Sequence, residues 1–454
     1  MKCHPAQHVL SELSAPFSSI AWVSGQGQIL LARSPEGLDA GLLPMGIGAV
    51  TQYFPLKEGD VALLKDPAVG GPGRDRLALV QCVSAESDSR PSVWAATSLR
   101  LPGSAEFRLP PVPLRQKGDT NQMLLQALGD SRHLLETQLN LLDGAAARFR
   151  HEAFRDLWSR RGLQDIEQRA KERIRRRLEE LPEGEVSFDL ATGGEQIRLR
   201  LQNDGRALRF DFTGTSPGRR LFLPLAATSG LVRTTVREWL QWEMELDSAC
   251  DHLIPLTVPN GCFLNAQTRD ACSGCLVEAA AWLKTAVEGA LHRWDRRQPR
   301  ALTNYFDLWS ELKFEGHPPE AVHLPSGSPA REGAEGTSFW QQRPDHGDCS
   351  VEDLERRLPV RVLRAVERPP SGHKARLNGG RGLLLQLEIL APGQIIHAAS
   401  PSRWPAEKHQ LPGDAPGVSL QRAGQDSRPA ANEWIPLQAG DVLTLHSGSG
   451  GSLL

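Results

Sequence analysis

Four cysteines in the middle of the chain carry thiols that could bind a metal ion. Cys272 and Cys275 are separated by two residues, which is the gap of a zinc knuckle. Cys250 and Cys262 do not form a second close pair, so buried free thiols explain the four cysteines better. A cysteine at the start of a helix can have a lowered thiol pKa, which makes a reactive Cys275 a minor alternative.

A histidine close to the C-terminal end suggests acid–base chemistry. His446 precedes Ser447 and Ser449, a combination that could form a hydrolase dyad. A nucleophilic serine of that kind sits on a sharp turn between a strand and a helix, and no such context follows His446. The sequence therefore disfavours a dyad.

Nucleotide binding by the chain alone is not indicated. The sequence contains neither the Gly-x-x-x-x-Gly-Lys-Ser/Thr loop nor the Gly-x-Gly-x-x-Gly fingerprint. The densest basic run, at positions 173 and 175–177, is flanked by glutamates, which is typical of a solvated helix face rather than of an RNA-binding patch.

The composition is that of a globular protein with more than one lobe. The chain has 454 residues, 40% of them hydrophobic, which is enough for two or three closely packed lobes. Its 52 basic and 54 acidic residues nearly cancel, which argues against nucleic acid or a membrane surface as a partner. The start lacks a signal peptide's apolar region, no apolar run could span a bilayer, and the seven cysteines fit reduced thiols, so we expect a cytoplasmic protein.

The N-terminal part of the chain predicts a sheet that carries a loop. Apolar runs at 20–23 and 29–31 flank a Gly-containing turn and indicate a hairpin. Runs at 61–64 and 77–80 indicate two further buried strands, and the segment 66–75 is predicted to join them as a loop. Loops carried on rigid sheets are frequent places for functional residues.

After a proline-rich connector at 109–113 the pattern becomes helical. Apolar residues at three- and four-residue spacing up to position 181 predict an amphipathic helical arm. Alternating apolar residues between 186 and 212, interrupted by Gly-Gly and Asp-Gly turns, predict an antiparallel meander. Small and apolar residues share one face of 275–294, which predicts a helix packed in the core.

The fold class predicted from these elements is α+β, multi-lobed, with mixed and antiparallel sheets. The segment 316–348 is polar and without a period, so we expect a long loop or insertion there. Apolar runs at 383–390 and 442–445 predict strands near the C-terminal end. The predicted parts are a sheet-rich lobe with the loop at 1–115, a central helical arm at 116–182, a meander plus packed helix at 183–315, a polar insertion at 316–350 and a β-rich C-terminal lobe at 351–454.

Short motifs in order along nearly the whole chain resemble the hydantoinase B and oxoprolinase B-type subunits. The clearest is Gly-Asp-Val at 59–61 followed by Asp-Pro-x-x-Gly-Gly at 66–71. Similar motifs are Asp-Phe-Thr-Gly at 211–214, the segment 258–266, and Gly-Gly-x-Gly at 379–382. The motif residues that we expect to shape the backbone are Gly70, Gly71, Asp211, Thr213, Gly214, Asn265, Gly379 and Gly380.

This resemblance implies an assembly rather than a single-chain enzyme. The B-type subunit pairs with a larger, ATP-binding A-type subunit, and such hetero-oligomers open small cyclic amides such as oxoproline and hydantoins or, in a related branch, carboxylate ketones. Phosphorylating the carbonyl oxygen of a ring amide makes it a better electrophile, which a metal-held or base-activated water can attack. Clustered His and Asp residues of the B-type subunit would serve that second step.

The sequence departs from the family pattern where this chemistry would occur. Gly37 and Gly41 stand where the family has two histidines, and no histidine lies between His8 and His133. Imidazole is favoured both for transition metals and for base chemistry at neutral pH, so a divalent metal is doubtful. The remaining candidate oxygen ligands or bases are Asp39, Asp66 and Asp75.

Two functions stay open from the sequence. The first is a B-type subunit of an ATP-dependent cyclic-amide hydrolase or related carboxylase complex, with impaired or altered catalysis. The second is a non-catalytic homologue that acts as the structural or regulatory partner of an A-type subunit. An aspartate before a proline, such as Asp66, is also a common turn residue, which fits the second function as well as the first.

Overall fold

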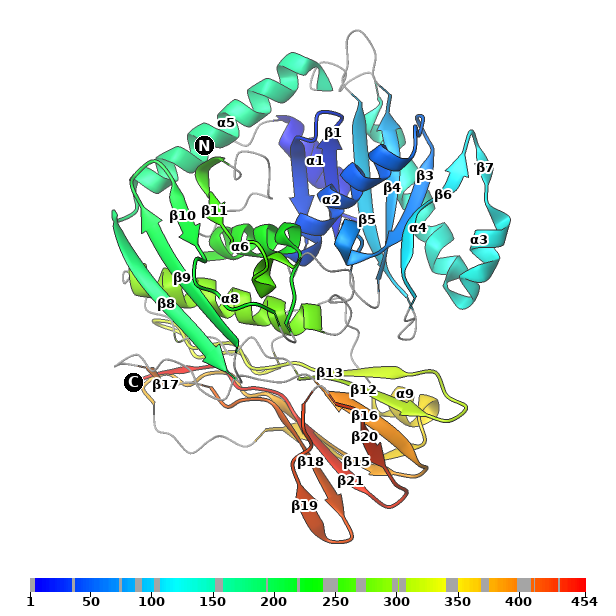
Figure 1. Cartoon of the computed structure of the whole chain (residues 1–454), viewed down its shortest axis with the longest axis vertical. Helices are drawn as coiled ribbons and strands as arrows, with labels where there is room; N and C mark the ends of the chain where they lie inside the picture. The colour runs from blue at the N-terminus through cyan, green and yellow to red at the C-terminus, as the bar shows by residue number, and fades with distance from the viewer. Residues whose placement is uncertain are drawn as a thin grey trace. The chain divides into compact units, whose positions relative to one another are not determined.

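The chain forms two compact units, which Figure 1 shows in a computed structural model. Unit 1 contains Met1–Ser187 and Leu199–Leu276, and unit 2 contains Phe188–Arg198 and Val277–Leu454. The structure describes residues 5–34, 37–72, 76–85, 92–101, 107–151, 158–192, 195–218, 221–239, 252–266, 275–295, 301, 308–339, 350–368, 375–397, 410–411, 413–431 and 433–454.

Unit 1 is built on a seven-stranded sheet ordered β2-β1-β5-β4-β3-β6-β7. Neighbouring strands run antiparallel, and the predicted hairpin is the β1–β2 pair. The strands are β1 Ile20–Ser24, β2 Ile29–Arg33, β3 Val61–Lys65, β4 Arg76–Ser84, β5 Val93–Arg100, β6 Leu109–Gln116 and β7 Asp119–Thr120.

Helices cover this sheet, whose central strands β3 and β4 are buried along their whole length. The helices and short 3-10 turns of unit 1 are α1 Pro5–Ser14, α2 Leu38–Tyr53, η1 Pro67–Val69, α3 Gln122–Ala127, η2 Gly129–Ser131, α4 Arg132–Phe149, α5 Arg160–Glu179, α6 Leu225–Trp239 and η4 Phe263–Asn265. Because alternate strand residues point to opposite faces, a sheet covered on both faces needs continuous apolar strands, which is the pattern in the sequence.

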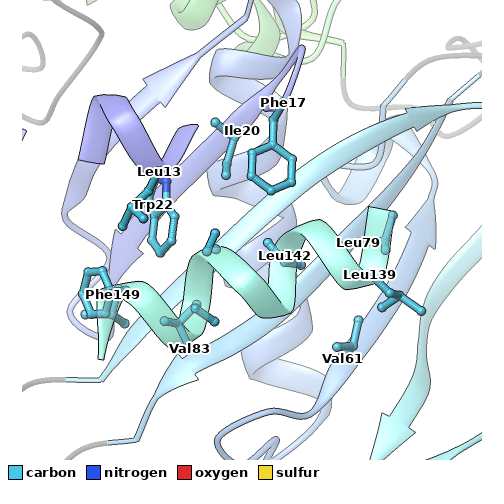
Figure 2. Packing of buried hydrophobic residues seen from close by; sticks show 14 of the residues in the cluster. Leu13, Phe17, Ile20, Trp22, Val61, Leu79, Val83, Leu139, Leu142 and Phe149 are labelled. Carbon is cyan, nitrogen blue, oxygen red and sulfur yellow. The ribbon is translucent and has the colours of Figure 1, made fainter. Parts of the chain in front are cut away.

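The hydrophobic core of unit 1 lies between the sheet and the helices α1 and α4. Figure 2 shows Leu139 and Leu142 of α4 among side chains of the strands. Phe149 at the end of α4 stacks on Trp22 of β1 with ring centroids 5.4 Å apart and on Trp158 at 4.4 Å. Full burial of each such side chain contributes about 1.5–3 kcal/mol, so this cluster fixes α4 on the sheet. The helix α2 instead contacts alternate strand residues such as Leu64.

A four-stranded sheet ordered β11-β10-β9-β8 follows in the chain. Its strands are β8 Gly184–Thr192, β9 Glu195–Asn203, β10 Leu208–Asp211 and β11 Leu256–Thr257. The burial of β9 alternates at every residue, so period-two apolar residues face inward. β9 and β10 are antiparallel, which confirms the predicted meander.

Unit 2 is a sandwich of two sheets, ordered β13-β12-β16-β20 and β14-β15-β21-β18-β19, which share one hydrophobic cluster. Helix α8 matches the predicted helix 275–294, and its apolar face is buried as expected. The elements are α8 Cys275–Trp294, β12 Leu308–Phe314, β13 Glu320–Leu324, α9 Val351–Arg357, β14 Val360–Glu367, β15 Leu383–Ile389, β16 Gly393–His397, β17 Gln410–Leu411, β18 Gly417–Arg422, β19 Gln425–Ser427, β20 Ile435–Leu437, β21 Val442–His446 and β22 Ser452–Leu453.

The predicted α+β class with several sheets and a central helical arm is confirmed, with two local corrections. The supposed connector 109–113 is part of strand β6. Its prolines are tolerated because β6 pairs along most of its length only with β3, with two irregularities in the register, while β7 pairs with only its last two residues. The supposed insertion 316–348 contains β13, whose Val322 and Leu324 alternate into the core. Residues 340–349 lie outside the described set.

No helix among the described residues is both long and apolar enough to cross a membrane.

Candidate functional site

The carboxylate of Asp39 is buried at the start of α2. Its Oδ2 accepts a hydrogen bond from Nη1 of Arg76 at 2.8 Å and another from Oγ of Ser98 at 2.6 Å. Arg76 begins β4 and Ser98 lies on β5, so two paired strands supply both donors. The Arg76 and Asp39 side chains are only 8% and 5% exposed, so solvent hardly screens the pair. These donors hold Asp39 in a structural ion pair.

Two glycines bring the backbone of α2 against that of α6. Gly37 precedes α2 with φ of 80°, in the left-handed region, and Gly41 lies in the first turns of the helix. A Cβ on Gly41 would stand 1.8 Å from the carbonyl oxygen of Ala226 in α6. A Cβ on Gly230 in α6 would stand 2.5 Å from the amide nitrogen of Gly41. Helix α6 therefore fills the space that a side chain at position 41 would need.

Asp66 caps a turn rather than pointing into a cleft. Its side chain accepts a hydrogen bond from the amide of Ala68 at 3.0 Å and so caps the short helix η1. Its carbonyl oxygen accepts from the amides of Val69 at 3.0 Å and Gly71 at 2.8 Å. The carboxylate and the backbone of Asp66 together close the loop that follows β3.

The two glycines of the same loop are required by close backbone contacts. Gly70 has φ of 86°, and a Cβ there would lie 2.1 Å from the amide nitrogen of Gly46 in α2. A Cβ on Gly71 would lie 2.2 Å from the amide nitrogen of Asp66. The double glycine thus lets the loop fold back on itself and pack on α2. Asp75, the third candidate carboxylate, lies outside the described residues.

The motif residues after β10 and near η4 also hold turns. Asp211 accepts from the amide of Thr213 at 2.9 Å and from its hydroxyl at 2.6 Å, and Gly214 follows with φ of 94°. Burial raises the pKa of Asp211, but the Thr213 bonds and Arg200 outweigh it, so that the pKa lies below its usual value. Asn265 is buried and donates to the carbonyl of Val258 at 3.3 Å.

Gly379 and Gly380 lie in a seam where backbone segments of unit 2 touch one another. A Cβ on Gly379 would stand 2.0 Å from the carbonyl oxygen of Gly450, and one on Gly380 would stand 2.0 Å from that of Thr337. Gly380 donates its amide to Ser328 at 2.8 Å and accepts from Gly450 at 2.8 Å. In the described part of the chain, these motif residues lie in turns or at close backbone contacts.

The cysteine and histidine hypotheses receive little support. Cys262 is a buried free thiol, and its burial raises its pKa above the ordinary value. Cys250 and Cys272 lie outside the described residues, as does the side chain of Cys275. The Ser447 hydroxyl donates to the carbonyl of Pro325, and His446 Nδ1 has no hydrogen-bond partner, so the described residues form no dyad.

A divalent metal ion, which the hydrolysis step outlined above could use, would need several His, Cys, Asp or Glu side chains close together. Within the described ranges, no group of three or more His, Cys, Asp or Glu side chains is close enough to hold a metal ion. Asp39 is engaged by Arg76 and Ser98, and Asp66 by its own loop. The described residues therefore do not fit a metal site of this kind.

Comparison with known proteins gives the family. Residues 107–453 match Hydantoinase B/oxoprolinase, which is well over half of the chain. The chain belongs to the hydantoinase B/oxoprolinase family. The matched range begins after Asp39 and Asp66, so the family match does not itself cover the loop and α2.

Two solved structures share the fold of this family member along its length. The ATP-dependent caprolactamase from Pseudomonas jessenii matches 98% of this chain and 88% of its own, with a TM-score of 0.79 and 18% identity. Nucleotide-free acetone carboxylase matches 98% of this chain and 72% of its own, with a TM-score of 0.70 and 11% identity. At these identities the comparisons establish the fold.

Some residues that contact the start of α2 could not be identified from the sequence of this hydantoinase B family member. Arg76 and Ser98 were missed because their spacing from Asp39 has meaning only once β4 and β5 are paired. Gly230 was missed as well. The four-residue spacing of Gly37 and Gly41 was a usable signal, since small residues one helical turn apart permit close helix packing.

Proposed function

We propose that this chain is the B-type subunit of an ATP-dependent amide hydrolase or carboxylase assembly and that it acts as a structural or regulatory partner without an active centre at α2. Family membership and the likeness to ATP-dependent caprolactamase and acetone carboxylase support the assembly. Because the sequence has no nucleotide-binding fingerprint, ATP binds to a larger A-type subunit in this proposal.

The contact between Gly41 and α6 is the observation that carries the non-catalytic part of the proposal. A histidine at position 41 would begin with a Cβ only 1.8 Å from a backbone oxygen of α6. Backbone cannot move aside as a flexible side chain can. The packing of α2 on α6 therefore requires glycine at position 41. The histidine of the family pattern is absent from this position, and α6 occupies the space that its side chain would need.

The carboxylates near this contact do not replace the missing base. A general base must reach the proton of an attacking water with a free lone pair, and its partners must tolerate the change of charge. Asp39 is a carboxylate that pairs with the buried guanidinium of Arg76, and its Oδ2 already accepts two hydrogen bonds. Asp66 caps η1 and packs with its loop. Both carboxylates are better explained by stability than by catalysis.

Co-expression with an A-type subunit tests this function. The proposal predicts a stable complex on size-exclusion chromatography in which the A-type subunit is better folded or more soluble than when it is expressed alone. It also predicts no stoichiometric divalent metal on this chain by mass spectrometry. Failure to form a complex would contradict the partner role, whereas bound metal that depends on Asp39 or Asp66 would contradict the non-catalytic role.

A further inference from the structure

The five-stranded sheet of unit 2 has one apolar face and one polar face. Leu385, Leu387, Leu443 and Leu445 belong to the hydrophobic cluster that the two sheets share. The residues between them in sequence point the other way. Strands β15, β21 and β18 are adjacent, so their alternate residues form rows across this second face.

Hydroxyl and amide side chains form one such row. Gln386 lies opposite Thr444, and Thr444 lies opposite Ser419 on its other side. Nε2 of Gln386 donates to Oγ1 of Thr444 at 3.3 Å. In the next row His446 lies opposite Gly417, and a Cβ on that glycine would stand 2.8 Å from Cε1 of the imidazole. Strand pairing therefore fixes which side chains lie side by side on the polar face.

A cavity of about 450 Å³ lies over this row, lined by residues of the adjacent strands β15, β21, β18 and β19. Gln386, Thr444 and Ser419 line it from β15, β21 and β18, and Asp426 and Arg428 line it from the edge strand β19 and the residue after it. Pockets that hold small molecules in proteins have volumes of roughly 300–1,000 Å³. The cavity is thus large enough for a small ligand.

The two charged groups of the cavity have opposite signs and are not paired. Asp426 and Arg428 are two residues apart, and within the described part of the chain neither side chain makes an ion pair or hydrogen bond. Among the described residues that line the cavity, Arg428 is the only cation and Asp426 the only anion. Burial lowers the pKa of the neighbouring His446 to about 4, and Arg368 and Arg428 add to this, so the imidazole is neutral at pH 7.

We propose that this cavity binds a small zwitterion, a free amino acid whose carboxylate pairs with Arg428 and whose ammonium group pairs with Asp426. Guanidinium forms charge-assisted hydrogen bonds with carboxylate, and a carboxylate accepts them from ammonium. Gln386, Ser419 and Thr444 line the space between and hydrogen-bond the polar parts of the ligand. Bases and sugars that bind by stacking fit less well, since none of the lining residues is aromatic.

An amino acid is also what ring opening of a lactam such as oxoproline yields, because adding water across the C–N bond leaves a carboxylate and an amine on one molecule. A role for the cavity in sensing such a product rests on the proposed function. The binding itself does not, since every lining residue belongs to unit 2 of this chain. Binding by the isolated chain and complex formation with a partner can therefore fail independently.

Isothermal titration calorimetry on the full chain tests the site. Glycine, γ-aminobutyrate and ε-aminohexanoate are titrated to vary the separation of the charges, with hexanoate and hexylamine as singly charged controls. We expect one amino acid to bind more tightly than either control, and Asp426→Asn and Arg428→Gln each to weaken it by about tenfold or more, which corresponds to about 1.4 kcal/mol. Asp353→Asn and Arg356→Gln, an exposed pair on α9, are the matched control variants and leave the affinity unchanged.

Three results would overturn the proposal. The first is that none of the amino acids binds. The second is that hexanoate binds as well as ε-aminohexanoate, which would indicate a simple anion site. The third is that the cavity variants bind as the wild type does, which would place the ligand elsewhere on the chain.

Discussion

Gly41 of α2 and Ala226 of α6 are in backbone contact, because a Cβ on the glycine would stand 1.8 Å from the alanine carbonyl oxygen. The first prediction follows from this contact. Gly41→Ala should destabilise the protein by about 3 kcal/mol or more, since the helices must move apart to relieve the overlap. Gly41→His should cost more and should not create a metal site.

Gly48 provides the matched control for Gly41. It lies in the same helix, and a Cβ there would have no atom within 4 Å. Gly48→Ala should therefore stabilise the protein by about 0.5–1 kcal/mol through helix propensity. Chemical denaturation of the three proteins measures both effects. Equal midpoints for Gly41→Ala and wild type would show that the two helices are not in contact in solution.

The buried ion pair gives the second prediction. Asp39→Asn removes the carboxylate charge with which Arg76 pairs, in a site where neither side chain is more than 8% exposed. Removing one partner of a buried pair costs about 3–5 kcal/mol. Glu332→Gln, which breaks an exposed pair with Arg376, should lower the stability much less, because solvent screens that pair. If urea denaturation shows the same small loss of unfolding free energy for Asp39→Asn as for Glu332→Gln, the Asp39 carboxylate does not stabilise the fold.

Asp66 allows a third prediction that separates a cap from a catalytic group. Asparagine keeps a side-chain oxygen that can accept from the Ala68 amide, whereas alanine has none. Asp66→Asn should therefore leave stability nearly unchanged, and Asp66→Ala should lower it by about 1 kcal/mol. Denaturation midpoints compare the two variants. Equal losses in both would mean that the negative charge matters and not the cap.

His446 gives a fourth prediction, for the dependence of stability on pH. Burial and the charges of Arg368 and Arg428 lower its pKa from 6.5 to about 4. Between these pH values the unfolded chain takes up a proton that the folded chain does not, so this residue reduces stability as the pH falls from 6.5 toward 4. His446→Gln should remove that part of the pH dependence of Tm. Parallel curves for the variant and wild type would contradict the buried, neutral imidazole.

Much of the fold was readable from the sequence because local patterns agree with tertiary structure. The alternation at 186–212 gave the meander, and the apolar face of 275–294 gave α8 with the bounds that the structure shows. Strand β6 was not readable, because three prolines between 110 and 113 normally exclude a strand. It forms only because β3 pairs on one side while the other side is nearly unpaired. Strand β13 was hidden by its polar surroundings.

The candidate site was only partly readable. The types of Asp66, Gly70 and Gly71 already indicated a turn, and the structure shows one. The role of Asp39 could not be inferred, since its partners Arg76 and Ser98 are brought to it by strand pairing far along the chain. Likewise, a cavity over the face of one sheet has no signature in a single sequence.

The most direct test of the account is turnover by the complex of this chain with an A-type subunit. ATP hydrolysis stimulated by oxoproline or hydantoin is compared between complexes that contain the wild-type chain and the Asp66→Asn variant. We expect that the complex forms and that the variant leaves any substrate-dependent rate unchanged. Loss of that rate in an intact, stable Asp66→Asn complex would contradict it and would assign catalysis to this loop.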